Sequence, residues 1–292
     1  MIMKNKNYIK KVIRDSLKED VGVGDITSNI LFNNKNFLVT ADLVAKEEAI
    51  LCGLDIFKEV FLQLSDLCVF DFQFKDGDLL KQNTIVGTIT SPVKIMLAGE
   101  RTGLNFLQRL SGISTLTHKF VSKSGRLNVY DTRKTTPLLR ELEKYAVRIG
   151  GGRNHRFGLY DMVLIKDNHI YASMKEQGYI NRIESIFNIV SKAKKEVENN
   201  YRIEVEVENF MEAKKAFEAG ADIIMFDNAK VAELTEFIKF LGPKRGSVEI
   251  EWSGNVTLEN IKSIKEFDID RVSIGALTHS ARAVDFSLKL RK

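Results

Sequence analysis

Six strand-like runs, each followed by a helical pattern, occupy the second half of the chain, and charged or small residues stand where they end. The runs cover residues 128–134, 162–169, 202–209, 222–228, 248–254 and 271–276. In a parallel α/β barrel the carboxyl ends of all strands meet at one mouth, where catalytic groups lie. Basic residues end the first two runs, acids the next two and small turn residues the last two. This order predicts a site for a polyanion together with a divalent cation.

Cationic side chains dominate one part of the predicted mouth. Arg133 and Lys134 end the first run, Lys166 lies near the end of the second, and His155 and Arg156 follow three consecutive glycines. A guanidinium matches a carboxylate with two parallel hydrogen bonds, whereas lysine supplies a point charge. One such residue alone is most often a solvated surface group. Five at one mouth predict the binding of anionic groups.

Two acids at the ends of neighbouring runs, Glu206 and Asp227, are candidates for a hard cation. Magnesium takes one or two carboxylates, directly or through water, and completes its shell with substrate phosphates. Glu204, Glu206 and Glu208 alternate along one run, so they share one face of a strand. They point into the barrel if helices cover the other face. The alternative is an edge strand with one wet face.

Small residues at the last two strand ends are candidates for a phosphate group. Ser253, Gly254 and Asn255 follow the fifth run, and Gly275 ends the sixth. Backbone N–H groups at the start of a helix bind phosphate, and the last strands of such barrels are its common position. Each turn alone would be an ordinary strand-to-helix connection.

Residues 1–110 predict an α+β module instead of a βαβ repeat. The expected elements are a helix at 8–19, a strand or strand pair at 37–51, a helix at 54–64, and a hairpin of strands at 69–74 and 79–90. A long helical stretch at about 93–123, with a break near Ser111 and Gly112, leads into the barrel. Thr136 and Pro137 predict the start of another helix. We therefore expect domains at 1–110 and 111–292, with a final helix packed back on the first.

Composition is typical of an ordinary globular protein, with 44% apolar and 28% charged residues. The net charge of +5 suits small anionic substrates. A basic nucleic-acid-binding protein is the alternative from a different class. It is disfavoured because the chain has no run of five like charges and no RNA-binding or zinc-finger motif.

Cell location and redox state follow from what the sequence lacks. No apolar run reaches the roughly 18 residues of a membrane span. The basic N-terminus precedes no apolar segment or cleavage site, so we expect a cytoplasmic protein without a membrane partner. Cys52 and Cys68 are expected to be buried free thiols.

Several motifs resemble those of one enzyme family, from about Leu17 to the C-terminus. They are Glu100-Arg101-Thr102, Asp131-Thr132-Arg133-Lys134-Thr135-Thr136-Pro137, Asn154-His155-Arg156, Leu164-Ile165-Lys166-Asp167-Asn168-His169, Glu204-Val205-Glu206-Val207-Glu208, Asp227-Asn228, Ser253-Gly254-Asn255 and Gly275-Ala276-Leu277-Thr278-His279-Ser280. Together they resemble quinolinate phosphoribosyltransferase, also called carboxylating nicotinate-nucleotide pyrophosphorylase. Motifs of this length are far more specific than any single short one.

The resemblance implies an N-terminal α/β sandwich followed by an open parallel α/β barrel of about six strands. It implies transfer of phosphoribose from phosphoribosyl pyrophosphate to quinolinate, giving nicotinate mononucleotide, pyrophosphate and carbon dioxide in NAD synthesis. The cofactor would be Mg²⁺. The protein would be a homodimer, or a hexamer, with active sites shared between subunits and no nucleic-acid partner.

Residue roles also follow from the resemblance. The quinolinate pocket would consist of Arg101, Arg133, His155, Arg156 and Lys166, with Arg101 reaching over from the neighbouring subunit. The expected catalytic residues are Lys134, Glu206 and Asp227, and the last two would hold the ribose hydroxyls and magnesium. Phosphoribosyl pyrophosphate would also meet Ser253, Gly254, Asn255 and Gly275.

Two features leave alternatives open. Trp252 stands where the family usually has alanine, so its indole either crowds the phosphate turn or points outward. The nearest alternative enzyme is a paralogue of the same fold associated with molybdate transport. The complete set of Arg133, His155, Arg156 and Lys166 favours quinolinate as the acceptor.

Overall fold

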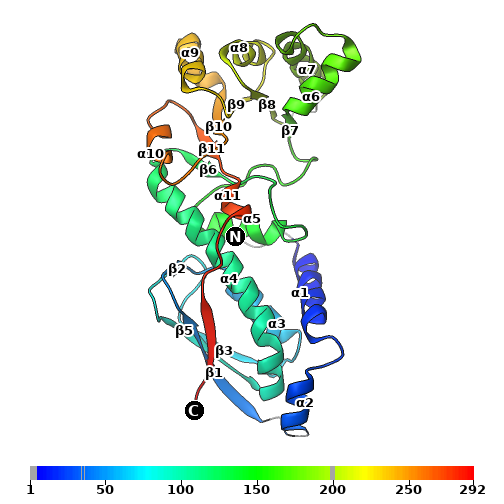
Figure 1. The fold of residues 1–292 in the computed structure, drawn as a ribbon, viewed down its shortest axis with the longest axis vertical. Helices are drawn as coiled ribbons and strands as arrows, with labels where there is room; N and C mark the ends of the chain where they lie inside the picture. The colour runs from blue at the N-terminus through cyan, green and yellow to red at the C-terminus, as the bar shows by residue number, and fades with distance from the viewer. Residues whose placement is uncertain (1–4, 34, 36, 198–200) are drawn as a thin grey trace. The chain divides into compact units, whose positions relative to one another are not determined.

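The computed structural model describes residues 5–33, 35, 37–197 and 201–292 (Figure 1). Of the basic residues of the N-terminus, Lys4 lies outside this range. The chain divides into two compact units. The first unit contains Met1–His118, Thr135–Gly151 and Ala276–Lys292, and the second contains Lys119–Lys134 and Gly152–Gly275. Each unit therefore combines segments that are far apart in the sequence.

A six-stranded parallel sheet forms the centre of the second unit. Its strands are β6 (Asn128–Tyr130), β7 (Val163–Ile165), β8 (Ile203–Val207), β9 (Ile223–Asp227), β10 (Glu249–Ser253) and β11 (Arg271–Ser273). They pair in the order β6-β11-β10-β9-β8-β7, all in parallel. The first strand thus lies beside the last, and β6 and β7 form the two edges. This is the predicted open parallel barrel, and each strand lies inside one of the six predicted runs.

Four helices follow the strands and form a row along one side of β7–β10 (Figure 1). They are α6 (Asp167–Gln177), α7 (Arg182–Glu196), α8 (Phe210–Glu218) and α9 (Val231–Leu241), and two short helices, η1 (Gly242–Ser247) and α10 (Ile261–Ile264), come later. The side chains of Asn181 and Asn209 accept backbone N–H groups at the starts of α7 and α8. The ring of Phe226 in β9 lies 5.7 Å from that of Phe237 in α9. Apolar packing therefore fills the space between this side of the sheet and the helices.

Strand β8 has two different faces. Ile203 and Val207 are fully buried together with Val205, and α7 and α8 contact this strand. Glu204 and Glu206 point to the other face, toward the inside of the sheet. β8 pairs with β7 on one side and β9 on the other, so the edge-strand alternative was wrong. Inward carboxylates need compensating cations because their desolvation is costly.

The first unit is an antiparallel sheet covered by helices. The sheet order is β12 (Phe286–Leu290), β1 (Leu38–Ala45), β5 (Ile85–Pro92) and β3 (Val69–Phe72), and β2 (Ala49–Ile50) pairs separately with β4 (Leu79–Leu80). Its helices are α1 (Lys6–Val21), α2 (Ile26–Phe32), α3 (Leu54–Leu62), α5 (Arg140–Ile149) and α11 (Ala276–His279), and α4 (Val93–Ser124) runs from this unit into the second. Phe57 and Phe61 of α3 and Leu104 of α4 pack against Leu43 and Ile89 of the sheet. The predicted N-terminal α/β sandwich is therefore confirmed.

The end of the chain is a strand and not the predicted final helix. β12 pairs with β1, so the C-terminus does return to the first unit. Phe286 and Leu288 stand two residues apart and both face its core. That spacing is the period of a strand.

The strands predicted at 69–74 and 79–90 do pair in antiparallel fashion, as β3 with residues 87–90 of β5, but the tight turn predicted at residues 75–78 was wrong, because β4 lies between β3 and β5 in the sequence and pairs with β2. Asp76 in this turn accepts the backbone N–H groups of Gly53 and Leu54 and so caps α3. The turn at Asp76 and Gly77 therefore caps the start of α3 through Asp76 and does not connect two directly paired strands.

Two predicted helix limits in the first unit were wrong. α4 is continuous through Ser111, which hydrogen bonds to the backbone of Cys52, and Gly112, which lets the carbonyl of Arg282 approach. α5 begins at Arg140, because Thr136 is held outside it by two hydrogen bonds to the Glu143 carboxylate. At Gly112 the absence of a side chain permits the close approach, and at Thr136 the hydrogen bonds decide where the helix begins.

Both cysteines, Cys52 and Cys68, are free and buried as predicted. Among the described residues, no helix is long and apolar enough to cross a membrane.

Candidate active site

The loop that carries His155 and Arg156 is held against the end of β6. Arg153 forms a parallel bridge with Tyr130, and its N–H donates to the carbonyl of Val129 at 2.7 Å. Asp131 is fully buried and accepts the N–H of His155 at 2.9 Å. The glycine run before the loop thus lets the chain turn back along β6. It brings His155 and Arg156 beside the strand that leads to Arg133 and Lys134.

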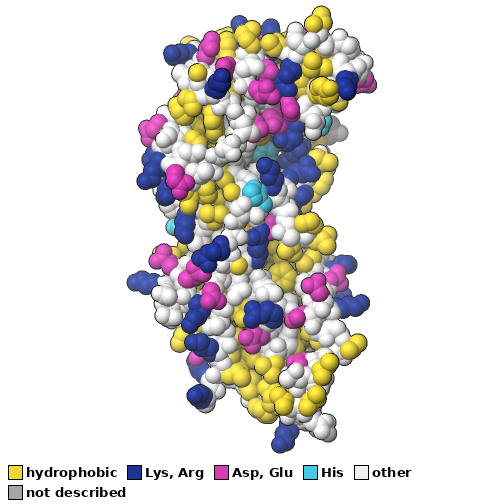
Figure 2. All heavy atoms as spheres, viewed as in Figure 1, with side chains coloured by type: hydrophobic (Ala, Val, Ile, Leu, Met, Phe, Trp, Pro, Cys, Tyr) yellow, Lys and Arg dark blue, Asp and Glu magenta, His cyan; other side chains and the backbone are white. Residues whose placement is uncertain are grey.

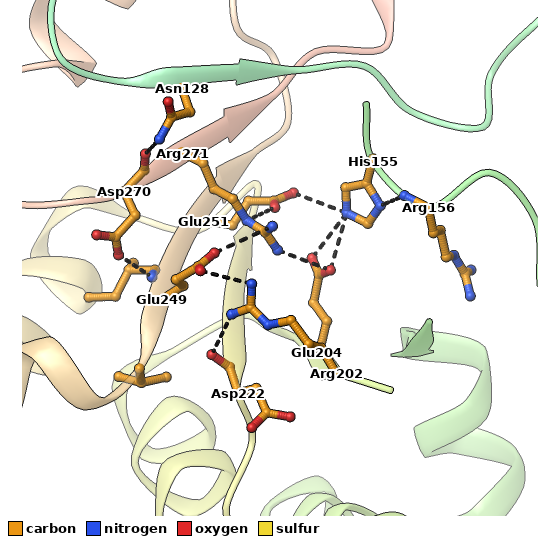
Figure 3. A network of polar contacts seen from close by, with 12 residues as sticks. Asn128, His155, Arg156, Arg202, Glu204, Asp222, Glu249, Glu251, Asp270 and Arg271 are labelled. Carbon is orange, nitrogen blue, oxygen red and sulfur yellow. Dashed lines mark hydrogen bonds and ion pairs between the residues drawn. The ribbon is translucent and has the colours of Figure 1, made fainter. Parts of the chain in front are cut away.

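A buried polar network lies on the inner face of the sheet of the second unit (Figure 3). Nε2 of His155 lies 3.1 Å from a carboxylate oxygen of Glu204 and 3.7 Å from one of Glu251. Arg271 contacts the same two acids, with 2.6 Å from its Nε to Glu251 and 3.3 Å from an Nη to Glu204. Glu204 and Glu251 are both fully buried. Two desolvated carboxylates therefore share one guanidinium and one imidazole.

These contacts shift the pKa values of the buried groups. Burial, followed by the charge of Glu204, raises the pKa of Glu251 to about 7. Burial alone would lower the pKa of His155, but the hydrogen bond that His155 donates to Glu204 and the charges of Glu204 and Glu251 raise it overall. Burial also opposes the charge of Arg271, and its two acidic partners raise its pKa. The two buried acids therefore favour the protonated forms of His155 and Arg271, although burial opposes both.

The second ring nitrogen of His155 is also used. Nδ1 accepts the backbone N–H of Arg156 at 2.8 Å. Because Nδ1 is the acceptor in this geometry, Nε2 is the ring nitrogen that donates to Glu204. His155 thereby ties the loop to β8.

His155, Glu204 and Glu251 also have the donor spacing of a metal site, since one ligand atom from each lies within 4.8 Å of the others. The guanidinium of Arg271 already contacts both acids. The chain itself therefore supplies the positive charge that a metal ion would bring.

Two predicted site residues meet at the ends of β7 and β8. Nζ of Lys166 donates to the carboxylate of Glu206 at 2.8 Å. Burial raises the pKa of Glu206, Lys166 opposes that shift, and a hydrogen bond with Asp227 adds to it. Glu206 and Asp227 are therefore neighbours, as their positions at adjacent strand ends predicted. In the space-filling view, acidic and basic side chains lie side by side over β7, β8 and β9 (Figure 2).

A pocket of about 470 Å³ opens beside Glu206 and Asp227. Its other lining residues are Asp167, Arg182, Glu208, Asn209, Asn228, Ala229, Lys230 and Glu233. Arg182 forms ion pairs with Asp167, Glu208 and Glu212, and these acids raise its pKa although burial lowers it. The pocket thus joins the two predicted acids to side chains of the α6–α9 row.

The small-residue turn after β10 has unusual backbone geometry. Gly254 has φ +91° and Asn255 has φ +50°. Trp252 precedes this turn and is buried. It alternates with Glu251, which faces the inner network, so the indole lies on the opposite, outer face of the sheet. The outward alternative for Trp252 is therefore correct.

Eleven of the twelve predicted site residues belong to the second unit, and one does not. Arg101 is an exposed residue of α4 in the first unit. Arg133 and Lys134 are exposed after β6, and the charge of Arg133 adds to burial in lowering the pKa of Arg156. Gly275 ends the second unit, two residues after the end of β11.

Three polar residues of this region were missed as site candidates. They are Glu251, Arg271 and Arg182. Glu249 and Glu251 repeat in β10 the alternation of acids in β8, which was a usable signal. Arg271 and Arg182 lie at the starts of elements, and nothing in their local sequence distinguishes them from surface arginines.

Comparison with known proteins identifies the family. Residues 25–111 match the family model for the quinolinate phosphoribosyl transferase N-terminal domain, and residues 113–289 match that for its C-terminal domain. The chain belongs to the quinolinate phosphoribosyltransferase family. The two matches together span nearly the whole described chain.

Individual members of the family are similar over their full length. A probable nicotinate-nucleotide pyrophosphorylase (carboxylating) of Bacillus subtilis is 41% identical over 286 residues, which cover 97% of this chain and 94% of that protein. One from Methanocaldococcus jannaschii is 39% identical and covers 98% of each chain. The structure of the nicotinate-nucleotide pyrophosphorylase from Francisella tularensis superposes with a TM-score of 0.88 at 37% identity, over 100% of this chain and 99% of that one. Fold and sequence therefore agree with the quinolinate phosphoribosyltransferase family.

Proposed function

We propose that this protein transfers phosphoribose from phosphoribosyl pyrophosphate to quinolinate with loss of carbon dioxide, forming nicotinate mononucleotide for NAD synthesis. One observation carries the proposal: Lys166 contacts Glu206. This contact joins the cationic residues to the acidic pair of Glu206 and Asp227. A dicarboxylate acceptor needs the cations, and a ribose with its metal needs the acids. The full-length similarity to nicotinate-nucleotide pyrophosphorylases supports the same reaction.

The quinolinate pocket would consist of Arg133, Arg156, Lys166 and His155, together with Arg101. Nε of Arg156 is buried and has no hydrogen-bond partner among the described residues. Arg133 adds a like charge nearby. Two neighbouring guanidinium groups are stabilised when carboxylates bind between them. The charge for quinolinate would come from the arginines and Lys166, while His155 fixes the loop through Glu204.

Phosphoribosyl pyrophosphate would lie across the ends of β8 to β11. Glu206 and Asp227 would accept hydrogen bonds from the ribose hydroxyls, and Lys134 would lie between the two substrates. The turn Ser253–Asn255 and Gly275 would bind the phosphate through backbone N–H groups.

The residues present fit a magnesium ion at Glu206 and Asp227. Both offer hard oxygen ligands at adjacent strand ends, they are close enough to interact, and they face an open pocket. When bound, the ion would neutralise charge on the leaving pyrophosphate. Repulsion between the two carboxylates is part of what raises the pKa of Glu206, and a cation shared between them would relieve it.

The chain's own groups would act mainly by position and charge. The Glu206 carboxylate would stabilise the oxocarbenium-like ribose as pyrophosphate leaves. The pyridine nitrogen of quinolinate then bonds to the ribose carbon. When the 2-carboxylate departs as carbon dioxide, the electron pair of the broken bond stays at C2, stabilised by the adjacent positive nitrogen, and C2 takes up a proton from water to give the product. Arg133, Arg156 and Lys166 would hold the ring in line for that step, so little acid–base catalysis is needed.

The proposal extends to assembly and organisation. Arg101 would come from the partner subunit of a homodimer, or of a hexamer built from such dimers. The division of the chain at residue 110 and the cytoplasmic location stay predictions.

A coupled assay tests the proposed function. Purified protein with phosphoribosyl pyrophosphate, Mg²⁺ and quinolinate should form nicotinate mononucleotide, carbon dioxide and pyrophosphate in equal amounts. A protein that is folded by circular dichroism but forms none of these products would overturn the proposal.

A further inference from the structure

Asn228 follows Asp227 at the end of β9 in a conformation that few residues adopt. Its φ is +50°, in the left-handed region where asparagine and glycine are favoured. Its backbone N–H donates to the carbonyl of Ser253 at 3.0 Å. The residue after Asp227 is thus attached to the last residue of the neighbouring strand β10.

The side-chain amide of Asn228 can be oriented in only one way. One end lies 3.0 Å from the Asp227 carboxylate, and the other lies 3.0 Å from the amide nitrogen of Asn255. The NH₂ of Asn228 donates to Asp227, since the amide oxygen would place an acceptor against carboxylate oxygens. The carbonyl oxygen of Asn228 then faces Asn255 and accepts from it. One side chain therefore connects the acid at the end of β9 to the turn after β10.

The backbone of Gly254 lies close to the same amide. A Cβ at this position would lie 2.2 Å from Oδ1 of Asn228 and 2.9 Å from its backbone nitrogen. Gly254 also has φ +91°, which disfavours any side chain. The amide of Asn228 lies directly against the backbone of the turn, and only glycine leaves room for it.

We propose that Asn228 is a positioning residue that fixes the spacing between Asp227 and the turn Ser253–Asn255. This spacing would let one sugar phosphate contact Asp227 with its ribose and the turn with its phosphate. The inference rests on the proposed function, in which Asp227 binds the ribose and the turn binds the phosphate. A rigid ligand that contacts both sites gains affinity only when their spacing is held before it binds. Asn228 is the side chain that bonds to both.

Glycine and aspartate substitutions separate this role from a backbone role. Asn228→Gly retains the left-handed conformation at no steric cost and removes both side-chain hydrogen bonds. Asn228→Asp retains the size and tolerates the same φ, but it places a carboxylate oxygen against Asp227. Asn83 in the first unit has φ +64° and is exposed, so Asn83→Gly and Asn83→Asp are matched controls.

The Kd for phosphoribosyl pyrophosphate without quinolinate should be measured by calorimetry, and both KM values by the coupled assay. Asn228→Gly should weaken phosphoribosyl pyrophosphate binding about 10-fold, and Asn228→Asp up to about 100-fold. The KM for quinolinate should change less than 3-fold, and the Asn83 variants should match the wild type. Unchanged binding in Asn228→Gly, or equal loss for both substrates, would overturn the inference.

A double-mutant cycle tests the connection itself. Asn255→Gly also retains its left-handed backbone, and its effect on phosphoribosyl pyrophosphate binding should not add to that of Asn228→Gly, since the two residues share one hydrogen bond. Full additivity would show that they act separately and would also contradict the inference. If wild-type protein forms no product, the proposed function fails, whereas normal wild-type turnover with unaffected Asn228 variants rejects only the positioning role.

Discussion

The ammonium group of Lys166 donates a hydrogen bond to the carboxylate of Glu206 at 2.8 Å, so the cationic and acidic parts of the site share one contact. Lys166 lies at the end of the edge strand β7, and Glu206 lies in the paired strand β8. Lys166 is half exposed, and Glu206 is largely covered. A group bound at the cations and a group bound at the acids would therefore meet at this pair, which places the reaction between them.

Selectivity for the acceptor should require its 2-carboxylate. Arg133, Arg156 and Lys166 supply more positive charge than a single carboxylate needs, and a site built for a charged group rejects an analogue that lacks it. Quinolinate should be turned over at least about 100-fold more efficiently, in kcat/KM, than nicotinate. The measurement compares the two acids with saturating phosphoribosyl pyrophosphate and Mg²⁺. Similar efficiencies would be incompatible with the proposed acceptor.

Removing the charge of either Glu206 or Asp227 should weaken the binding of phosphoribosyl pyrophosphate and magnesium more than the binding of quinolinate. Glu206→Gln and Asp227→Asn retain side-chain size but lose the charge, so we expect the KM for phosphoribosyl pyrophosphate to rise about 10- to 100-fold. The Mg²⁺ concentration for half-maximal rate should rise as well, while the KM for quinolinate changes little. Glu236→Gln, at an exposed position of α9, is the matched control. Unaltered Mg²⁺ dependence in both variants would remove these acids from the metal site.

Activity should be restored by mixing two inactive proteins if Arg101 comes from the partner subunit. Arg101 belongs to the first unit, whereas Lys134 belongs to the second. Arg101→Ala and Lys134→Ala chains should each be inactive alone. A heterodimer would contain one site with both residues intact and one with neither, so about half of the sites can recover at a two-fold interface.

The mixing experiment needs verified heterodimers, for example chains with two different affinity tags purified in sequence. A mixture of Lys134→Ala with Asp227→Asn is the control, since both residues belong to the second unit. This control should not recover, because each of its two sites lacks one of the two residues. If the Arg101 mixture does not recover either, the active site is completed within one chain.

The buried Glu251 should make stability depend on pH. Its pKa is raised from 4.5 to about 7, so between these values the folded state binds its proton more tightly than the unfolded state does. The free energy of unfolding should therefore fall as pH rises from about 5 to 8, by on the order of 2 kcal/mol from this group. The raised pKa of His155 acts in the same direction, because stability held below its ordinary pKa is lost as pH rises.

Glu251→Gln removes the titrating group and retains the shape of the side chain. Urea unfolding at pH 5, 6, 7 and 8 should show a smaller fall for this variant than for the wild type. Glu236→Gln should retain the wild-type slope. A variant whose stability falls as steeply as that of the wild type would show that Glu251 is ionised throughout this range.

Local patterns determined most of the secondary structure and the mouth of the sheet. Apolar runs and alternation locate β6 to β11, because each residue's choice of face is set by its nearest neighbours. The positions of Glu206, Asp227 and Lys166 at strand ends followed from the same patterns, since parallel strands all point the same way. Their contact in the structure, Lys166 with Glu206 and Glu206 with Asp227, confirms that part of the prediction.

Tertiary structure alone decided which strands pair and what the buried charges contact. β4 pairs with β2 and Asp76 caps α3, although the local sequence around Asp76 and Gly77 is typical of a tight hairpin turn. Arg271 meets Glu204 across 67 positions of sequence, and Asn228 meets Asn255 across 27. Such contacts depend on desolvation and on exact spacing between distant segments. Neither quantity is present in a local pattern, because burial exists only once the chain has folded.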